Sequence, residues 1–155
     1  MRAAALVCLG AGAGLVRGDL RDVRGTDVAC RSGGVLVDVR GLRARAVPVL
    51  ARFQDRLLAA AAFAGDGLIC GGTDPGRRNL TFRLVNSLAG GGGLPRLEAG
   101  RLRATWQRDC GELPGLAAFM RAAGISCSQR LGDLVAGLEA GSEEDAVRIL
   151  GAARP

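Results

Sequence analysis

The chain has 155 residues, 48% of them hydrophobic, and a formal net charge of +6. This length suits one domain with a proper core, and the apolar content excludes disorder as the default state. The charge is uneven, because residues 1–110 hold 17 arginines against 9 acids (net +8), whereas residues 111–155 hold 4 against 6 (net −2). A basic body suits contact with a polyanion such as DNA, although a solvated arginine-rich surface explains the same count.

The five cysteines are scattered without a C-x-x-C pair, and the chain has no histidine. Zinc sites of the mixed Cys/His type are therefore excluded, and a four-cysteine site would need close pairs. We expect no metal and no other cofactor. We also expect buried, unpaired thiols, as is common in reduced domains, at Cys8, Cys30, Cys70, Cys110 and Cys127.

No apolar stretch reaches the roughly 18 residues that span a bilayer. The first apolar run is similar to a signal peptide, but it continues directly into an amphipathic pattern. We therefore expect a cytoplasmic protein that does not contact a membrane, with secretion as the alternative.

The first helix is predicted over 3–14, an apolar segment that ends at glycine. A short helix over 18–25 follows, with Leu20 and Val23 facing inward.

Alternation of Val35, Val37 and Val39 with more polar residues then predicts a small antiparallel sheet, whose third strand covers 44–49. Residues 66–72 predict a further short strand. Further helices are predicted over 50–64, 79–89, 97–110, 114–123, 127–138 and 143–150, with a glycine joint over 90–93 and helix stops at Gly124 and Gly141.

The glycines near the start, Gly10, Gly12 and Gly14, raise the question of a nucleotide-binding loop. A dinucleotide fingerprint needs G-x-G-x-x-G after a strand, but its last position falls on Leu15 and the preceding segment is helical in character. No G-K-[ST] is present for a P-loop. We therefore interpret these glycines as helix ends and turns.

Four blocks resemble the catalytic domain of tyrosine recombinases, the phage-integrase family. The first block is "GLVRGDLRDVRGTDV". It is similar to the family pattern, which reads Gly-Leu-Arg, two residues, Glu-Leu, two residues and Leu-Arg-x-x-Asp-Ile. The family's three-stranded sheet, which ends in a basic residue and Val-Pro, is similar to "GGVLVDVRGLRARAVPV". The remaining blocks are "GRLRATW", similar to His-x-Leu-Arg-His-Thr-Phe, and "AAGISCSQRLGDL", similar to the final Leu-Gly-His segment before the tyrosine.

The resemblance spans about residues 5–138 and implies a mostly helical α+β fold with a small three-stranded antiparallel sheet. It divides the chain into a recombinase-like domain over 1–140 and a C-terminal helix and tail over 141–155. The family's separate helical domain, which closes around DNA, has no counterpart in this sequence.

The resemblance also implies a catalytic site that lacks most of the family's catalytic residues. The first phosphate-clamping arginine falls on Val16, with Arg17 beside it, and the second is kept as Arg103. The hairpin lysine has Arg40 or Arg43 nearby, and arginine is a poor proton donor at neutral pH. The histidine positions fall on Gly100, Ala104 and Ile125, and the nucleophile falls on Leu134.

The chain contains neither tyrosine nor histidine, so Ser126, Cys127 or Ser128 would have no neighbouring base to activate it. We expect an inactive recombinase-like protein that binds DNA weakly and without strong sequence preference, or that modulates a recombinase or associates with itself. The expected phosphate contacts are Arg103, Arg17, Arg40, Arg43, Arg77 and Arg78.

Several of these arginines have a structural alternative. For Arg103 it is an ion pair with Asp109 or Glu98, and for Arg77, Arg78, Arg43 and Arg45 it is a solvated charge. Trp106 is expected in the core. If the arginines scatter and pair with acids, the rival function is a protein-interaction scaffold that kept the fold without binding DNA.

Overall fold

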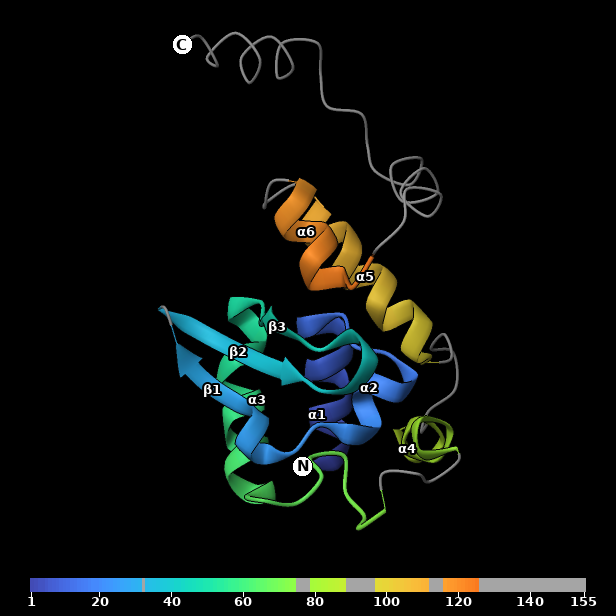
Figure 1. Cartoon of the computed structure of the whole chain (residues 1–155). Helices are drawn as coiled ribbons and strands as arrows, with labels where there is room; N and C mark the ends of the chain where they lie inside the picture. Colours follow the sequence, from blue (N-terminus) through green and yellow to red (C-terminus); the bar gives the residue numbers. More distant parts are fainter. Residues whose placement is uncertain (32, 75–78, 89–96, 112–115, 126–155) are drawn as a thin grey trace, which may run out of the picture.

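The computed structural model describes residues 1–31, 33–74, 79–88, 97–111 and 116–125. Within these residues the fold is α+β, as predicted, with helices packed around one small three-stranded antiparallel sheet (Figure 1). The helices and strands are α1 (Arg2–Val7), α2 (Arg17–Asp22), β1 (Val28–Arg31), β2 (Gly34–Val39), β3 (Arg45–Pro48), α3 (Ala51–Ala64), α4 (Leu80–Leu88), α5 (Ala99–Gly111) and α6 (Leu116–Ala123).

The first helix lies at the centre of the molecule. α1 continues into a π-helical turn, Cys8–Gly12, and together they form the helix predicted over 3–14. After the exposed Arg2 this helix is apolar, and α3, α4 and α5 contact it, so that Leu6 and Leu9 are fully buried.

The glycines of this helix provide space for neighbouring helices. A Cβ at Gly10 would lie 2.8 Å from Leu102 Cδ1 in α5, and a Cβ at Gly12 would lie 2.8 Å from Phe53 Cβ in α3. Gly14 ends the helix with a φ of +64°, a left-handed conformation that favours glycine. The three glycines thus serve helix packing and helix termination.

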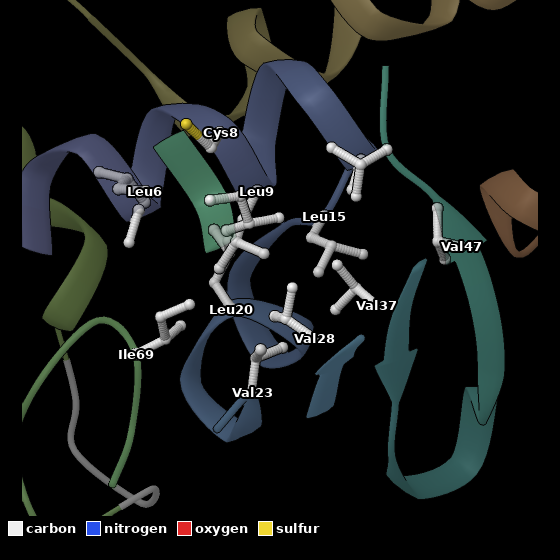
Figure 2. Close-up of a cluster of buried hydrophobic side chains, with 14 of the residues drawn as sticks. Leu6, Cys8, Leu9, Leu15, Leu20, Val23, Val28, Val37, Val47 and Ile69 are labelled. Carbon is white, nitrogen blue, oxygen red and sulfur yellow. The ribbon is translucent and has the colours of Figure 1, made fainter. Parts of the chain in front are cut away.

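The sheet packs its inner face against the helices. β2 is the central strand and pairs antiparallel with β1 and β3, so Val28, Val37 and Val47 lie opposite one another. These side chains are buried, and Figure 2 shows Val28 and Val37 beside Leu15 and Leu20. The period-two pattern of the sequence therefore corresponds to one buried face.

The α5–α6 pair adds an aromatic contact to the core. Trp106 of α5 is buried and stacks on Phe119 of α6, with ring centroids 5.8 Å apart. Its predicted place in the core is confirmed. α5 in turn contacts the π-helical turn, so the pair is attached to the central helix.

One prediction about a strand and one about a thiol are wrong. Residues 66–72 form only an isolated bridge between Leu68 and Arg24, because Gly71 and Gly72 both have positive φ and turn the chain before a strand can extend. Cys30 is exposed on β1, whereas Cys8 and Cys70 are buried as expected.

Several predictions lie outside the described residues. They are the helices over 127–138 and 143–150, the joint over 90–93, the stop at Gly141, the thiol of Cys127 and the boundary at residue 140. In the part of the chain that the structure describes, no helix has both the length and the apolar character needed to cross a membrane.

Candidate phosphate-contact site

The last turn of α6 leaves two carbonyl groups for outside donors. Gly124 has a φ of +65°, and its amide donates to the Arg121 carbonyl at 3.2 Å, while the Ile125 amide donates to the Met120 carbonyl at 3.0 Å. This is the Schellman pattern, in which the carbonyls of Met120 and Arg121 accept hydrogen bonds from the residues that follow the helix. It provides no such donor for the last two carbonyls, those of Ala122 and Ala123.

Two arginines from other elements bind these carbonyls. Arg45 of β3 donates from Nε to the Ala122 oxygen at 3.0 Å, and Arg103 of α5 donates from Nη2 to the Ala123 oxygen at 2.7 Å. The Nη1 of Arg103 donates to the Gly14 oxygen at 2.8 Å. Arg103 therefore bridges the end of the central helix and the end of α6.

A buried carboxylate, that of Asp19, pairs with Arg45. Asp19 Oδ2 accepts from Arg45 Nη2 at 3.0 Å, and Asp19 Oδ1 lies 3.8 Å from Arg43 Nη2. The side chains of Asp19 and Arg45 are 8% and 6% exposed, whereas that of Arg43 is 54% exposed. Arg43, Arg45 and Arg103, with Asp19, are called the arginine cluster below, and Arg43 is its solvent-facing member.

The arginine cluster joins the four segments that carry the recombinase resemblance. Gly14 and Asp19 belong to the first block, Arg43 and Arg45 to the hairpin, and Arg103 to the third block. The fourth block begins at Ala122, whose carbonyl binds Arg45. Hydrogen bonds thus connect segments that are up to 89 residues apart in the sequence.

Arg40, another expected phosphate contact, binds a different carboxylate. Its Nε lies 3.0 Å from Asp27 Oδ1, and its Nη2 contacts the same oxygen. The hydrogen bond to Asp27, together with the charge of that carboxylate, raises the pKa of Arg40. Asp27 also accepts the Arg24 amide at 2.8 Å, so this pair holds the turn before β1.

The other expected positions are spread over several elements. Arg17 is the first residue of α2, preceded by Val16 in an extended conformation, and Gly100 lies exposed on α5. Ile125 follows α6. Outside the described residues lie Arg77, Arg78, Ser126, Cys127, Ser128 and Leu134.

The partners of the arginines were the least predictable feature. Asp109, considered as a partner for Arg103, contacts Arg52 and Arg108. The expectation of a solvated Arg45 is wrong, since it is buried against Asp19. Asp19 itself was overlooked as a site residue, although its match to the acidic position of the first block was the signal that could have found it.

The chemistry of the described site is limited to charge and hydrogen bonding. Burial raises the pKa of Cys8 and Cys110, and that of Cys70 to about 12, so these thiols are protonated at neutral pH. No group of three or more Cys, Asp or Glu side chains suited to a metal ion occurs among the residues that the structure describes. Guanidinium groups hold oxyanions well but do not transfer protons.

No protein-family model matches the chain, and no curated protein matches it at a significant level. The residues themselves are therefore the guide to function.

Proposed function

We propose that this chain is a catalytically inactive tyrosine-recombinase-like protein of the cytoplasm. It binds the phosphates of the DNA backbone and so modulates DNA integration or recombination. The observation that carries the proposal is the meeting of the four recombinase-like segments at the arginine cluster. The lack of tyrosine and histidine supports the inactive state, because the chain has neither the family's nucleophile nor a histidine base that could activate a serine or cysteine.

Charge supports the same proposal. The guanidinium of Arg43 is 54% exposed and gives an anion access to the arginine cluster. A planar guanidinium meets a phosphate with paired hydrogen bonds, which are stronger than bonds to neutral acceptors. Contacts of this kind bind DNA without reading its sequence.

The test is a salt titration of the purified chain with a short fluorescent duplex, read by anisotropy. We expect the logarithm of affinity to fall linearly with the logarithm of salt, equally for two unrelated sequences. Arg43→Gln removes one solvent-facing charge with little effect on stability, since the exposed Arg43 lies 3.8 Å from Asp19 and this carboxylate keeps its closer partner, Arg45. It should weaken binding to both sequences and make the slope shallower by about 0.9 for each phosphate that the variant no longer binds.

The matched control is Arg56→Gln, which removes the same charge from an exposed position on α3. An equal decrease in affinity for the two variants would mean that net charge, and not the arginine cluster, drives binding. Incubation with a nicked duplex should leave no denaturant-resistant protein–DNA band, and such a band would overturn the inactive state.

A second candidate is a protein-interaction scaffold of the same fold. It is favoured by the internal partners of Arg40, Arg45 and Arg103, and by Phe63, whose side chain is 71% exposed on α3. If the chain does not bind the duplex even at about 50 mM salt, where phosphate contacts are strong, the scaffold is the better account.

A further inference from the structure

One side of α3 is exposed along the whole helix. The opposite side packs on α1, β1 and β2, where Leu57, Ala60 and Ala61 of α3 are buried. The exposed side begins with charged residues and continues with apolar ones. Its central part consists of Arg56, Ala59, Ala62 and Phe63, and the exposed Asp66 follows just after the helix. These five residues are called the α3 face below.

The apolar part of the α3 face combines one large side chain with two small ones. Phe63 is 71% exposed, more than any other large hydrophobic side chain among the described residues. Ala59, one turn before it, is also exposed and leaves room above the helix for a large side chain from a partner. Aromatic residues are enriched at protein–protein interfaces, where their apolar area is removed from water.

The order of residues along the α3 face is self-complementary. Arg56 lies three residues before Ala59, and Asp66 lies three residues after Phe63. When two copies of α3 pack antiparallel about a twofold axis level with the midpoint of Ala59 and Phe63, residue 59 of each copy comes opposite residue 63 of the other, and residue 56 opposite residue 66. Each phenylalanine then meets an alanine, and each positive charge meets a negative one.

Neighbouring side chains preserve the sign of the charge at each end of the α3 face. Around Arg56 the arginines outnumber the aspartates by three to two, as Arg52, Arg56 and Arg108 against Asp55 and Asp109. At the other end, Arg24 donates to the backbone carbonyl of Asp66 at 2.8 Å. The ion pairs between described residues do not include the Asp66 carboxylate. A partner with the same order of charges, in the opposite direction, therefore fits both ends.

We propose that α3 of one copy packs antiparallel on α3 of a second copy through the α3 face, so that the chain forms a twofold homodimer. The proposal goes beyond DNA binding and does not depend on it. The 14 residues of α3 extend over only about 21 Å, so one helix pair gives a smaller interface than that of standard stable complexes. The dimer should therefore form reversibly and depend on protein concentration.

The first test is sedimentation equilibrium of the full chain without nucleic acid, from about 10 μM to about 1 mM, the range of weak complexes. The average mass should rise from monomer toward dimer and no further, because a twofold contact closes on itself. Phe63→Gln should raise the dimer Kd by about tenfold or more, since each dimer loses two buried aromatic side chains. The matched control is Phe82→Gln, which changes a 55% exposed phenylalanine on α4 and should leave the Kd unchanged.

The second test reverses charges to check the antiparallel pairing. Neutralising one exposed charge changes affinity little, whereas reversal places like charges opposite each other at both ends of the dimer. Arg56→Asp and Asp66→Arg should each weaken the dimer by about tenfold, and the double variant should restore it. An equimolar mixture of the two single variants should also associate, because each copy supplies the charge that the other needs. Pairing within one copy cannot produce that result.

The outcomes decide between this partner and others. A chain that stays monomeric over the whole concentration range would overturn the proposal and leave the DNA proposal standing. Dimers that Phe82→Gln weakens as much as Phe63→Gln would place the contact elsewhere and also overturn it. If neither the double variant nor the mixture recovers association, the antiparallel pairing is wrong. Because all three substituted residues of the α3 face are exposed, the variants should fold, and circular dichroism checks this.

Discussion

Asp19 and Arg45 form a buried ion pair to which a third group, Arg43, is added from the solvent side. Both members of the buried pair lose most of their hydration, so each depends on the other and on the hydrogen bonds around it. Arg45 uses its remaining nitrogens on the Ala122 and Arg43 carbonyls, each at 3.0 Å. The pair therefore connects α2, β3 and the end of α6.

Asp19→Ala should destabilise the protein strongly. The change leaves the Arg45 guanidinium buried without its counter-charge, which costs about 3–5 kcal/mol in comparable pairs. The free energy of unfolding is measured by urea titration. The matched control is Asp38→Ala, which removes the partner of Arg31 from a pair whose side chains are both 46% exposed, and should cost no more than about 1 kcal/mol. Equal costs would show that burial does not distinguish the two carboxylates.

At the level of secondary structure, periodicity predicted the described helices and strands closely. The helix over 50–64 corresponds to Ala51–Ala64, and the alternation of valines corresponds to the buried face of β2. These features are local, because the chain itself carries the period of 3.6 or 2. The segment over 66–72 is apolar enough for a strand, but positive φ at Gly71 and Gly72 limits it to one bridge.

The candidate site was less predictable, for a physical reason. The sequence identified Arg103 as a residue of interest on a helix, but it donates hydrogen bonds to the carbonyls of Gly14 and Ala123, whose positions are set by tertiary packing. Every residue carries a backbone carbonyl, so no residue type marks these acceptors. The nearby acid Asp109 is instead bound to Arg52 and Arg108.

The packing around Gly25 and Gly18 differs, so we expect substitution by alanine to change the stability of the protein in opposite directions. A Cβ at Gly25 would lie 2.3 Å from the Ala61 carbonyl oxygen and 2.5 Å from that of Gly65, where the turn before β1 meets the end of α3. Gly25→Ala should therefore destabilise the protein by about 1–3 kcal/mol, because backbone atoms cannot rotate away. Thermal and urea unfolding measure the change.

Gly18 of α2 provides the matched comparison. The nearest atom to its added Cβ is Arg21 Nη2 at 3.9 Å, an ordinary contact. Gly18→Ala should stabilise the protein by about 0.5–1 kcal/mol, since alanine loses less conformational entropy in a helix. A gain in stability from Gly25→Ala would mean that the turn and α3 are not packed as described.

For the whole molecule, the cysteines are the side chains expected to titrate near pH 9, because the chain contains neither lysine nor tyrosine. Burial raises the pKa of Cys70 from its ordinary value of 9.0 to about 12, and raises those of Cys8 and Cys110 as well. In the unfolded chain these thiols ionise earlier than in the folded one. Above about pH 9 the unfolded state therefore binds fewer protons, and stability must fall as pH rises.

We expect the free energy of unfolding to decrease between about pH 9 and pH 12, with Cys70 contributing up to about 1.4 kcal/mol per pH unit. Urea titrations across this range, under reducing conditions, measure the slope. Cys70→Ala should lower stability near neutral pH but make the slope shallower by that amount. An unchanged slope would show that Cys70 is open to water in the folded protein.

The position of the central helix has a consequence for synthesis on the ribosome. After Arg2, α1 and its π-helical turn are apolar, yet α5, which contacts this turn, is made much later (Figure 1). Gly14 and Arg103, which bind each other, are separated by 89 residues, and at about 5–20 residues per second that interval lasts about 4–18 s. For those seconds the side of this helix that α5 covers in the folded protein stays exposed on the nascent chain, even after α3 has been made, and it is a surface that a ribosome-associated chaperone could bind.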